Sequence, residues 1–235
     1  MASSYGQFCP VAKAMELLDE RWTMLVVREM IAGSQHFNDI RRGVPNMSPT
    51  LLSKRLRTLG RAGVVERWEH GNRVTYQLTQ AGRELVPIVE ALGQWGIRWI
   101  GELGEEDLDP HLLMWDLRRN IAVDRMPPGR TVIGFTFPDL EPAARDWWAV
   151  VTDEVDICDH DPGFEVHVRV LAPLRTMVQV WRGDIGWADA TRSGDLVVEG
   201  PSRLRSALPE WFLLSDFAAT PRPGPEAVTS ISVGG

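Results

Sequence analysis

The stretch from residue 41 to 61 constrains the fold of this chain more than any other part. It contains six Lys/Arg and no Asp or Glu, although the whole protein carries a net charge of −7. Ser48-Pro49 favours a helix start, because Ser is a good N-cap and Pro suits the first helical position. The apolar residues that follow recur at helical spacing and predict a buried stripe: Leu52, Leu56 and Leu59. We therefore expect a capped amphipathic helix with a basic outer face.

A short β-hairpin is predicted directly after this helix. Gly63 stands where a helix C-terminus favours glycine, and two β-like runs follow at 64–69 and 73–78, joined by His70-Gly71-Asn72. Helical periodicity also precedes the basic helix, and Thr79 can cap a long helix after the hairpin. This order is what a winged helix-turn-helix requires, in which one helix enters the major groove of DNA.

Charge is divided unevenly along the chain. Residues 1–100 contain 13 Lys/Arg and nine Asp/Glu, a net charge of +4, whereas residues 101–235 contain 12 and 23, a net charge of −11. A chain of 235 residues can form two ordinary domains. We expect a DNA-binding and dimerisation domain at 1–103, a second domain at 104–217 that stays away from DNA, and a flexible tail at 218–235.

Several functional classes are disfavoured by composition. Two cysteines form no disulfide framework, and neither a secretory leader nor a membrane-length apolar run is evident, so we expect a soluble cytoplasmic protein without membrane partners. The run 158–161 with His167 contains residue types used in catalysis, but its spacing matches no nucleophile or metal site. We therefore expect no enzyme activity, no catalytic residues, no metal and no cofactor.

The candidate DNA contacts lie on the basic helix, just before it and at the hairpin tip. The N-terminal part of a recognition helix reaches base edges, and flanking cations meet phosphates. The alternative is that these charges only solvate a helix surface. Candidates for base edges and phosphates are Ser48, Thr50, Ser53, Lys54 and Arg57; those for the DNA backbone are Arg41, Arg42, Arg55 and Arg61; those of the hairpin tip are His70, Asn72 and Arg73.

An ordered set of short motifs spans residues 9–99. It includes Arg21-Trp22-Thr23, His36-Phe37-Asn38-Asp39-Ile40, Met47-Ser48-Pro49 with Leu52-Ser53, and Val74-Thr75-Tyr76 with Leu78-Thr79 and Gly82. In this order the set closely resembles the HxlR family of bacterial winged-helix transcription regulators. The resemblance implies a homodimer on pseudo-palindromic double-stranded DNA, with the first and last helices of the domain packed across a two-fold axis. The positions expected at that interface are Cys9, Met15, Leu18, Leu92, Trp95 and Trp99.

The chain departs from the family pattern at two places. The family often has Gly-Gly-Lys before its Trp, where this chain has Asp19-Glu20-Arg21, and often has Pro in the wing, where this chain has Gly71-Asn72-Arg73. Some relatives use the cysteine that matches Cys9 as a thiol redox sensor. For Cys9 the alternative is a structural role as a small residue buried at the dimer interface.

A second set of short motifs runs from about residue 105 to 217. It includes Thr131-Val132 with Phe135-Thr136-Phe137, Asp161-Pro162-Gly163, Trp181-Arg182-Gly183-Asp184, and Ser193-Gly194-Asp195-Leu196. The set resembles the sterol carrier protein type 2-like domain, in which helices and a sheet enclose an apolar tunnel. Aromatic walls supply much of the contact in apolar pockets. The candidate ligand-binding residues, each of which could instead fill the core, are Trp147, Trp148, Trp181, Trp187 and Trp211.

Together these patterns predict an α+β chain with a winged helix-turn-helix domain followed by a sterol-carrier-like domain with an apolar pocket. The expected function is a dimeric transcription regulator whose second domain senses a small hydrophobic or amphipathic metabolite. Repression is the default, because a bound dimer blocks polymerase. Two alternatives remain open: a redox switch through Cys9 with a second domain that only dimerises, and a lipid-binding or carrier protein in which the basic helix has another role.

Overall fold

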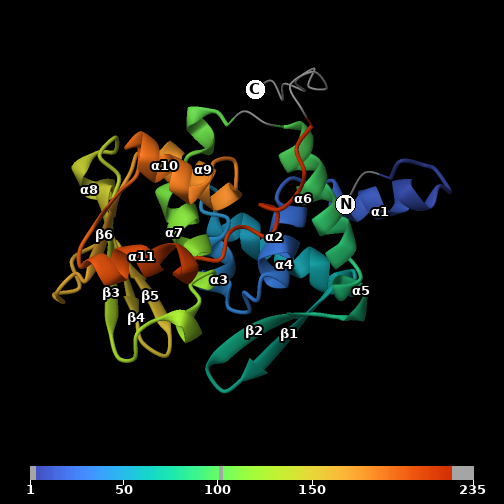
Figure 1. Ribbon diagram of the computed structural model, residues 1–235. Helices are drawn as coiled ribbons and strands as arrows, with labels where there is room; N and C mark the ends of the chain where they lie inside the picture. Colours follow the sequence, from blue (N-terminus) through green and yellow to red (C-terminus); the bar gives the residue numbers. More distant parts are fainter. Residues whose placement is uncertain (1–3, 101–102, 224–235) are drawn as a thin grey trace. The chain divides into compact units, whose positions relative to one another are not determined.

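The computed structural model describes residues 4–100 and 103–223 and has an α+β architecture (Figure 1). The chain divides into two compact units, Met1–Trp95 and Gly96–Gly235. Each unit has its own hydrophobic core. Within the described ranges, every helix is too short or too polar to cross a bilayer.

The first unit has the element order of a winged helix-turn-helix. Its helices before the wing are α1 (Pro10–Leu18), α2 (Thr23–Ile31), α3 (Phe37–Arg42) and α4 (Pro49–Arg61). The wing consists of the antiparallel strands β1 (Val65–His70) and β2 (Arg73–Leu78). The helices after it are α5 (Gln80–Arg83) and α6 (Val86–Trp99), and the division between the two units falls in the last turn of α6. Its core joins α2, α3, α4 and β1 through Val26, Val27, Met30, Ile40, Val44, Met47, Leu52, Leu56, Leu59, Val64 and Val65.

The long helix expected after Thr79 is divided in two. Thr79 caps α5, its Oγ1 accepting a hydrogen bond from the Gly82 amide at 3.2 Å, but α5 ends after one turn. The next helix, α6, begins at Val86. Pro87 is therefore its second residue, where a missing N–H removes no intrahelical hydrogen bond, and it does not bend a longer helix.

The second unit is built on a five-stranded sheet of order β5-β4-β3-β6-β7. All neighbouring strands are antiparallel except β3 and β6, which run parallel. The strands are β3 (Thr131–Thr136), β4 (Asp146–Val151), β5 (Val155–Cys158), β6 (Val168–Leu171) and β7 (Val197–Glu199). The helices are α7 (Pro110–Arg119), α8 (Pro142–Arg145), α9 (Leu174–Arg182), α10 (Trp187–Ser193) and α11 (Ser202–Trp211), with short 3₁₀ turns at Glu105–Asp107 and Val123–Arg125.

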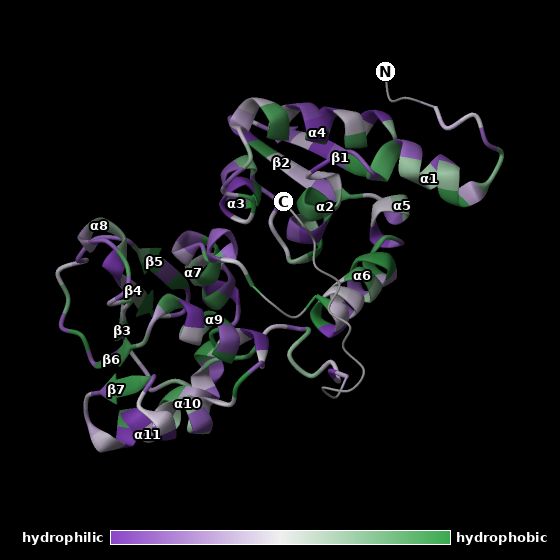
Figure 2. Cartoon of the chain, turned by 90° about the horizontal axis from the view of Figure 1, so that it is seen from above, coloured by the Kyte–Doolittle hydropathy of each residue, from purple (hydrophilic) through white to green (hydrophobic). Residues whose placement is uncertain are grey.

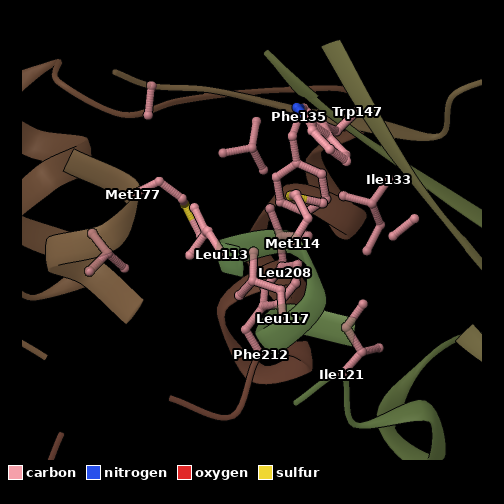
Figure 3. Packing of buried hydrophobic residues seen from close by; sticks show 14 of the residues in the cluster. Leu113, Met114, Leu117, Ile121, Ile133, Phe135, Trp147, Met177, Leu208 and Phe212 are labelled. Atoms are coloured by element: carbon pink, nitrogen blue, oxygen red, sulfur yellow. The ribbon is translucent and has the colours of Figure 1, made fainter. Parts of the chain in front are cut away.

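Burial alternates along β4 and β6, whereas β3 in the middle of the sheet is buried at every position from Thr131 to Phe135. On β4, Trp147 and Ala149 are buried, whereas Trp148 and Val150 are only half-buried on the opposite face. Side chains from α7, from the sheet and from α11 meet in the core (Figure 3). The members of this cluster labelled in Figure 3 are Leu113, Met114, Leu117, Ile121, Ile133, Phe135, Trp147, Met177, Leu208 and Phe212.

The segment after α11 is tied to the C-terminal end of α9. The Ser215 amide donates to the Trp181 carbonyl at 3.0 Å, and Arg222 pairs with Asp184 at 2.5 Å. A Cβ on Gly183 would lie 2.8 Å from Ala218, so the glycine permits this close approach. Residues 218–223, the start of the predicted flexible tail, therefore pack on the second unit, and the rest of that predicted tail lies outside the described residues.

Candidate nucleic-acid interface

The outer face of α4 is the main candidate for contact with DNA. Ser48 caps this helix, its Oγ accepting a hydrogen bond from the Leu51 amide at 3.3 Å, and Pro49 is the first helical residue. The apolar stripe is buried as expected, which turns the opposite face outward. The predicted contact residues exposed on or beside that face are Ser48, Thr50, Lys54, Arg57 and Arg61, and Ser53 is half-buried. A helix that presents cations and hydroxyls in this way can enter a major groove.

The arginines that precede this helix are also exposed. Arg41 and Arg42 form the last turn of α3. Arg42 pairs with Asp39 at 3.2 Å on the same helix, and this exposed pair contributes little to stability. Both side chains are therefore accessible to solvent beside the start of α4.

Arg55 differs from the other candidates because it faces inward. Its side chain is 9% exposed, and its guanidinium pairs with the carboxylate of Glu20. Its Nε donates a hydrogen bond to the Arg21 carbonyl at 3.1 Å. Periodicity explains the result, because residue 55 lies on the same stripe as Leu52 and Leu59. The expectation of a DNA-backbone contact by Arg55 is therefore withdrawn.

The wing places its three predicted contact residues at one end. His70 and Arg73 are cross-strand partners, and Gly71-Asn72 forms the turn between them, with Gly71 at φ 57°. The left-handed backbone at this turn favours glycine. His70, Asn72 and Arg73 are all exposed, so the hairpin tip is available to a neighbouring groove or phosphate.

Trp68 is a surface residue of the wing that the sequence pattern did not identify. Val65 and Trp68 are three positions apart on β1, so their side chains point to opposite faces of the wing. Trp68 pairs with Thr75 and is 56% exposed, whereas Val65 is buried. The solvent face of the wing therefore presents an indole ring close to the His70–Arg73 tip.

A buried carboxylate fixes the turn between α3 and α4. Glu29 on α2 is fully buried and pairs with Arg28 at 2.8 Å, and Arg28 also donates to the Gly43 carbonyl at 2.7 Å. A Cβ on Gly43 would lie 1.8 Å from Glu29 Cδ, so only glycine fits there. Sequence reasoning missed this contact; the available signal was an acidic residue inside an otherwise apolar helical stretch.

Two helices of the first unit expose apolar side chains. In the described part of the chain, neither α1 nor α6 contains a buried residue, and Figure 2 colours several turns of α6 as hydrophobic. Among the predicted interface residues, Leu92 and Trp95 are 53% and 47% exposed, Met15 is exposed, and Cys9, Leu18 and Trp99 are half-buried. Phe8, Val11 and Ile88 are further exposed apolar residues that the sequence analysis did not include.

The five tryptophans predicted to bind ligand do not share one surface. Trp147 and Trp211 are buried in the core of the second unit, and Trp181 and Trp187 pack against it. Trp148 lies on the other face of the sheet. Trp187 also stacks on Phe212, with ring centroids 5.9 Å apart. The core-filling alternative therefore describes Trp147 and Trp211, whereas Trp181 and Trp187 stand at the edge of the core.

The Cys158–His167 region has the geometry of a turn. Its Asp161 carboxylate accepts a hydrogen bond from the Gly163 amide at 2.8 Å, and His167 Nδ1 contacts the Val132 amide at 3.0 Å instead of the thiol. Burial raises the pKa of the Cys158 thiol, and nearby Asp156 adds to the effect. A raised pKa lowers the thiolate fraction. Among the described residues, no cluster of three or more His, Cys, Asp or Glu side chains is arranged to hold a metal.

Comparison with known proteins concerns the first unit. A family model described as HxlR-like helix-turn-helix matches residues 17–103. The uncharacterized HTH-type transcriptional regulator YvaP of Bacillus subtilis is 39% identical over 99 residues, which cover 40% of this chain and 92% of that protein. An HTH-type transcriptional regulator of Synechocystis is 34% identical over 98 residues, covering 40% and 73%. Among solved structures, the redox regulator HypR in its reduced form is 33% identical and covers 38% of this chain and 91% of its own, with a TM-score of 0.36.

Proposed function

Because the chain belongs to the HxlR-like helix-turn-helix family of transcriptional regulators, we propose that it is a dimeric repressor whose second unit binds a small apolar or amphipathic ligand. The observation that carries the DNA-binding part is the capped helix α4 with its exposed basic face. Thr50, Lys54 and Arg57 would read base edges and phosphates in the major groove, and the wing tip would contact the DNA backbone beside it. A dimer bound at a promoter would exclude polymerase.

Arg57→Ala tests the assignment of the recognition helix. Arg57 is exposed, so its loss should leave the fold intact and weaken DNA binding by about 1–3 kcal/mol, with the salt dependence of log K reduced by about 1. Fluorescence anisotropy at several salt concentrations measures the affinity and its salt dependence. The probe is a duplex that the wild-type chain selects from a random library. Arg205→Ala on α11 is the matched control, because it removes an exposed arginine from the second unit. Equal DNA binding by the Arg57 variant and the wild type would refute the assignment of α4 as the recognition helix.

We propose that a second copy of the chain covers α1 and α6. Phe8, Val11, Leu92 and Trp95 form exposed apolar surface on or beside these helices, which is the composition of an obligate interface. A two-fold dimer would present two copies of α4 to half-sites about one helical turn apart, or a multiple of it. The proposed operator is therefore pseudo-palindromic.

The ligand-binding part of the proposal rests on the second unit. Its sheet with packed helices is compatible with the sterol-carrier-like architecture that the sequence resembles. Trp181 supplies a more specific observation: its indole Nε1 is inaccessible to solvent, and no hydrogen-bond acceptor from the described residues reaches it. An unpaired buried donor costs about 1–3 kcal/mol. An oxygen atom of an apolar ligand seated beside Trp181 would remove this cost.

Extraction of the native protein tests ligand binding. The full chain, purified from its host and then denatured, should release a stoichiometric small molecule that mass spectrometry detects. A chain truncated after Leu103, purified in parallel, should release none. An extract identical to that of the truncated chain would argue for a second unit that serves only dimerisation.

The redox alternative rests on one position. Cys9 is a free, half-buried thiol at the N-cap of α1, next to the apolar surface assigned to the dimer. Oxidation there would place a polar group or a crosslink at the proposed interface. Mass spectrometry after mild peroxide treatment decides the question, with Cys158 as the internal comparison. An unmodified and uncrosslinked Cys9 would exclude this mechanism.

A further inference from the structure

Arg55 connects the recognition helix to the turn between α1 and α2. It belongs to α4 but lies on the buried stripe of that helix. Its guanidinium pairs with Glu20, and its Nε bonds to the Arg21 carbonyl at 3.1 Å. Both partners lie 34 or 35 positions away in sequence, so this contact is a tertiary link and not a feature of the helix itself.

The turn that Arg55 contacts has an unusual backbone. Asp19 is the C-cap of α1, and Trp22, the N-cap of α2, has a φ of 79°, the single positive value among the described residues other than glycine. A side chain at such a φ is sterically strained and needs support from its surroundings. Arg21 lies over the Trp22 ring at 5.4 Å, and Arg55 holds the Arg21 carbonyl. The arginine therefore restrains the segment at which the strain is located.

The guanidinium group suits this role for a chemical reason. A buried cation requires a paired anion and further acceptors, since an unpaired buried charge is strongly unfavourable. The planar guanidinium can bond to Glu20 and to the Arg21 carbonyl at the same time, whereas a lysine ammonium cannot reproduce that geometry. Apolar packing by Leu52 and Leu56 holds α4 on the core but restricts its rotation and tilt less sharply. The hydrogen bond from Arg55 Nε to the Arg21 carbonyl, together with the ion pair to Glu20, supplies that restriction.

We infer that Arg55 is a positioning residue that sets the orientation of the recognition helix relative to α1, the helix proposed to form the dimer. The inference rests on the proposed DNA-binding function. Two recognition helices must match half-sites at a fixed spacing, so a small rotation of α4 against α1 misplaces both copies. Loss of Arg55 thus weakens binding to the specific site while the phosphate-contacting residues remain in place.

Glu20→Gln separates positioning from direct contact with DNA, because the two roles predict changes of opposite sign. If Arg55 contacted phosphate, removal of the Glu20 carboxylate would free the arginine, remove a repulsive charge and tighten DNA binding. If Arg55 positions α4, the same change weakens binding to the specific site. The probe is the duplex that the wild-type full chain selects from a random library, and a scrambled duplex reports non-specific binding.

Arg55→Gln and Arg55→Lys complete the experiment. We expect affinity for the selected duplex to fall roughly tenfold or more in both, with the salt slope and the scrambled-duplex affinity kept at wild-type values. Arg57→Gln is the matched control and should reduce the salt slope by about 1. Circular dichroism and thermal melting establish that each variant is folded; if Arg55→Gln does not fold, Glu20→Gln and Arg55→Lys carry the test.

The outcomes are distinguishable. Two outcomes would overturn the positioning role and leave the DNA-binding function intact. One is tighter DNA binding by Glu20→Gln. The other is unchanged affinity of Arg55→Lys together with a lowered salt slope in Arg55→Gln. A wild-type chain that selects no duplex overturns the proposed function and this inference with it. A double variant Glu20→Gln/Arg55→Gln should bind no worse than Arg55→Gln alone, because the two residues act through one contact.

Discussion

The two units use tryptophan differently. The four tryptophans of residues 1–100 are all at least partly exposed, at positions 22, 68, 95 and 99. Among residues 103–223, Trp115, Trp147 and Trp211 are buried, and the other three tryptophans are half-buried. The first 100 residues therefore leave large apolar side chains at their surface, whereas residues 103–223 place half of their tryptophans in a core.

This difference indicates where each unit obtains its stability. The second unit encloses a cluster that includes Phe135, Phe212 and Trp211, so its folding depends on contacts within one chain. The first unit has a smaller core, and its α1 and α6 expose apolar residues that a partner copy would cover. An exposed aromatic at a protein interface can contribute more to assembly than to folding of the single chain.

Trp211→Ala should have the largest effect and tests the self-sufficiency of the second unit. Trp211 is 1% exposed, and its truncation should cost about 3–5 kcal/mol of unfolding free energy. Hydrogen exchange with mass spectrometry should show lost protection in residues 103–223 and unchanged protection in residues 4–95. Trp148→Ala is the control and should have a smaller effect, because Trp148 is half-buried and lies on the opposite face of β4 from the core. Equal loss of protection in both units would refute the separation.

Trp95→Glu should act on assembly instead of on folding. A charge at a central apolar interface position should weaken dimerisation by about 2 kcal/mol or more, while the melting of the single chain changes little. Sedimentation equilibrium measures the dimer dissociation constant. Trp68→Glu is the matched control, because Trp68 is similarly exposed but lies on the wing. A dimer equally stable in both variants would remove α6 from the interface.

Trp181→Phe should separate ligand binding from stability. The substitution removes an indole N–H that has no acceptor among the described residues, so unfolding free energy should change by no more than about 1 kcal/mol. The amount of co-purified ligand should fall at the same time, and Trp148→Phe should leave it unchanged. Undiminished ligand in the Trp181 variant would show that this N–H does not contact it.

The smallest expected effect concerns the segment that precedes α1. Hydrogen bonds from Lys13 and Ser4 hold the pKa of Glu16 below its ordinary value of 4.5. A lowered folded-state pKa means that this contact stabilises the segment above the unfolded value and is lost as pH falls through the lowered pKa. NMR shifts of Tyr5, whose amide bonds to Glu16 at 3.1 Å, should report release of the segment in acid. In Glu16→Gln the Tyr5 shifts should show no such transition; a transition that persists would assign it to another group.

Local sequence patterns determined much of the first unit. The start of α4 at Pro49, its buried leucine stripe and the two-residue wing turn follow from interactions between residues at most four positions apart or between adjacent strands. Predictions failed where a local pattern allowed more than one outcome. The pattern after Thr79 predicted one long helix, but the chain forms two helices, α5 and α6, with a break between them.

The sequence by itself determined the capped basic helix, the hairpin and the resemblance that places this chain among HxlR-like regulators. Tertiary structure alone decided which charged and aromatic side chains face inward. Helical periodicity places Arg55, unlike Arg57, on the buried stripe of α4, but its partner Glu20 lies far away in sequence and meets it only in the folded chain. Trp147 and Trp148 are adjacent in sequence, yet the elements packed on the sheet make Trp147 a core residue and leave Trp148 half-buried on the opposite face. The burial of a side chain depends on the elements packed against it, and those elements are brought together only when the whole chain folds.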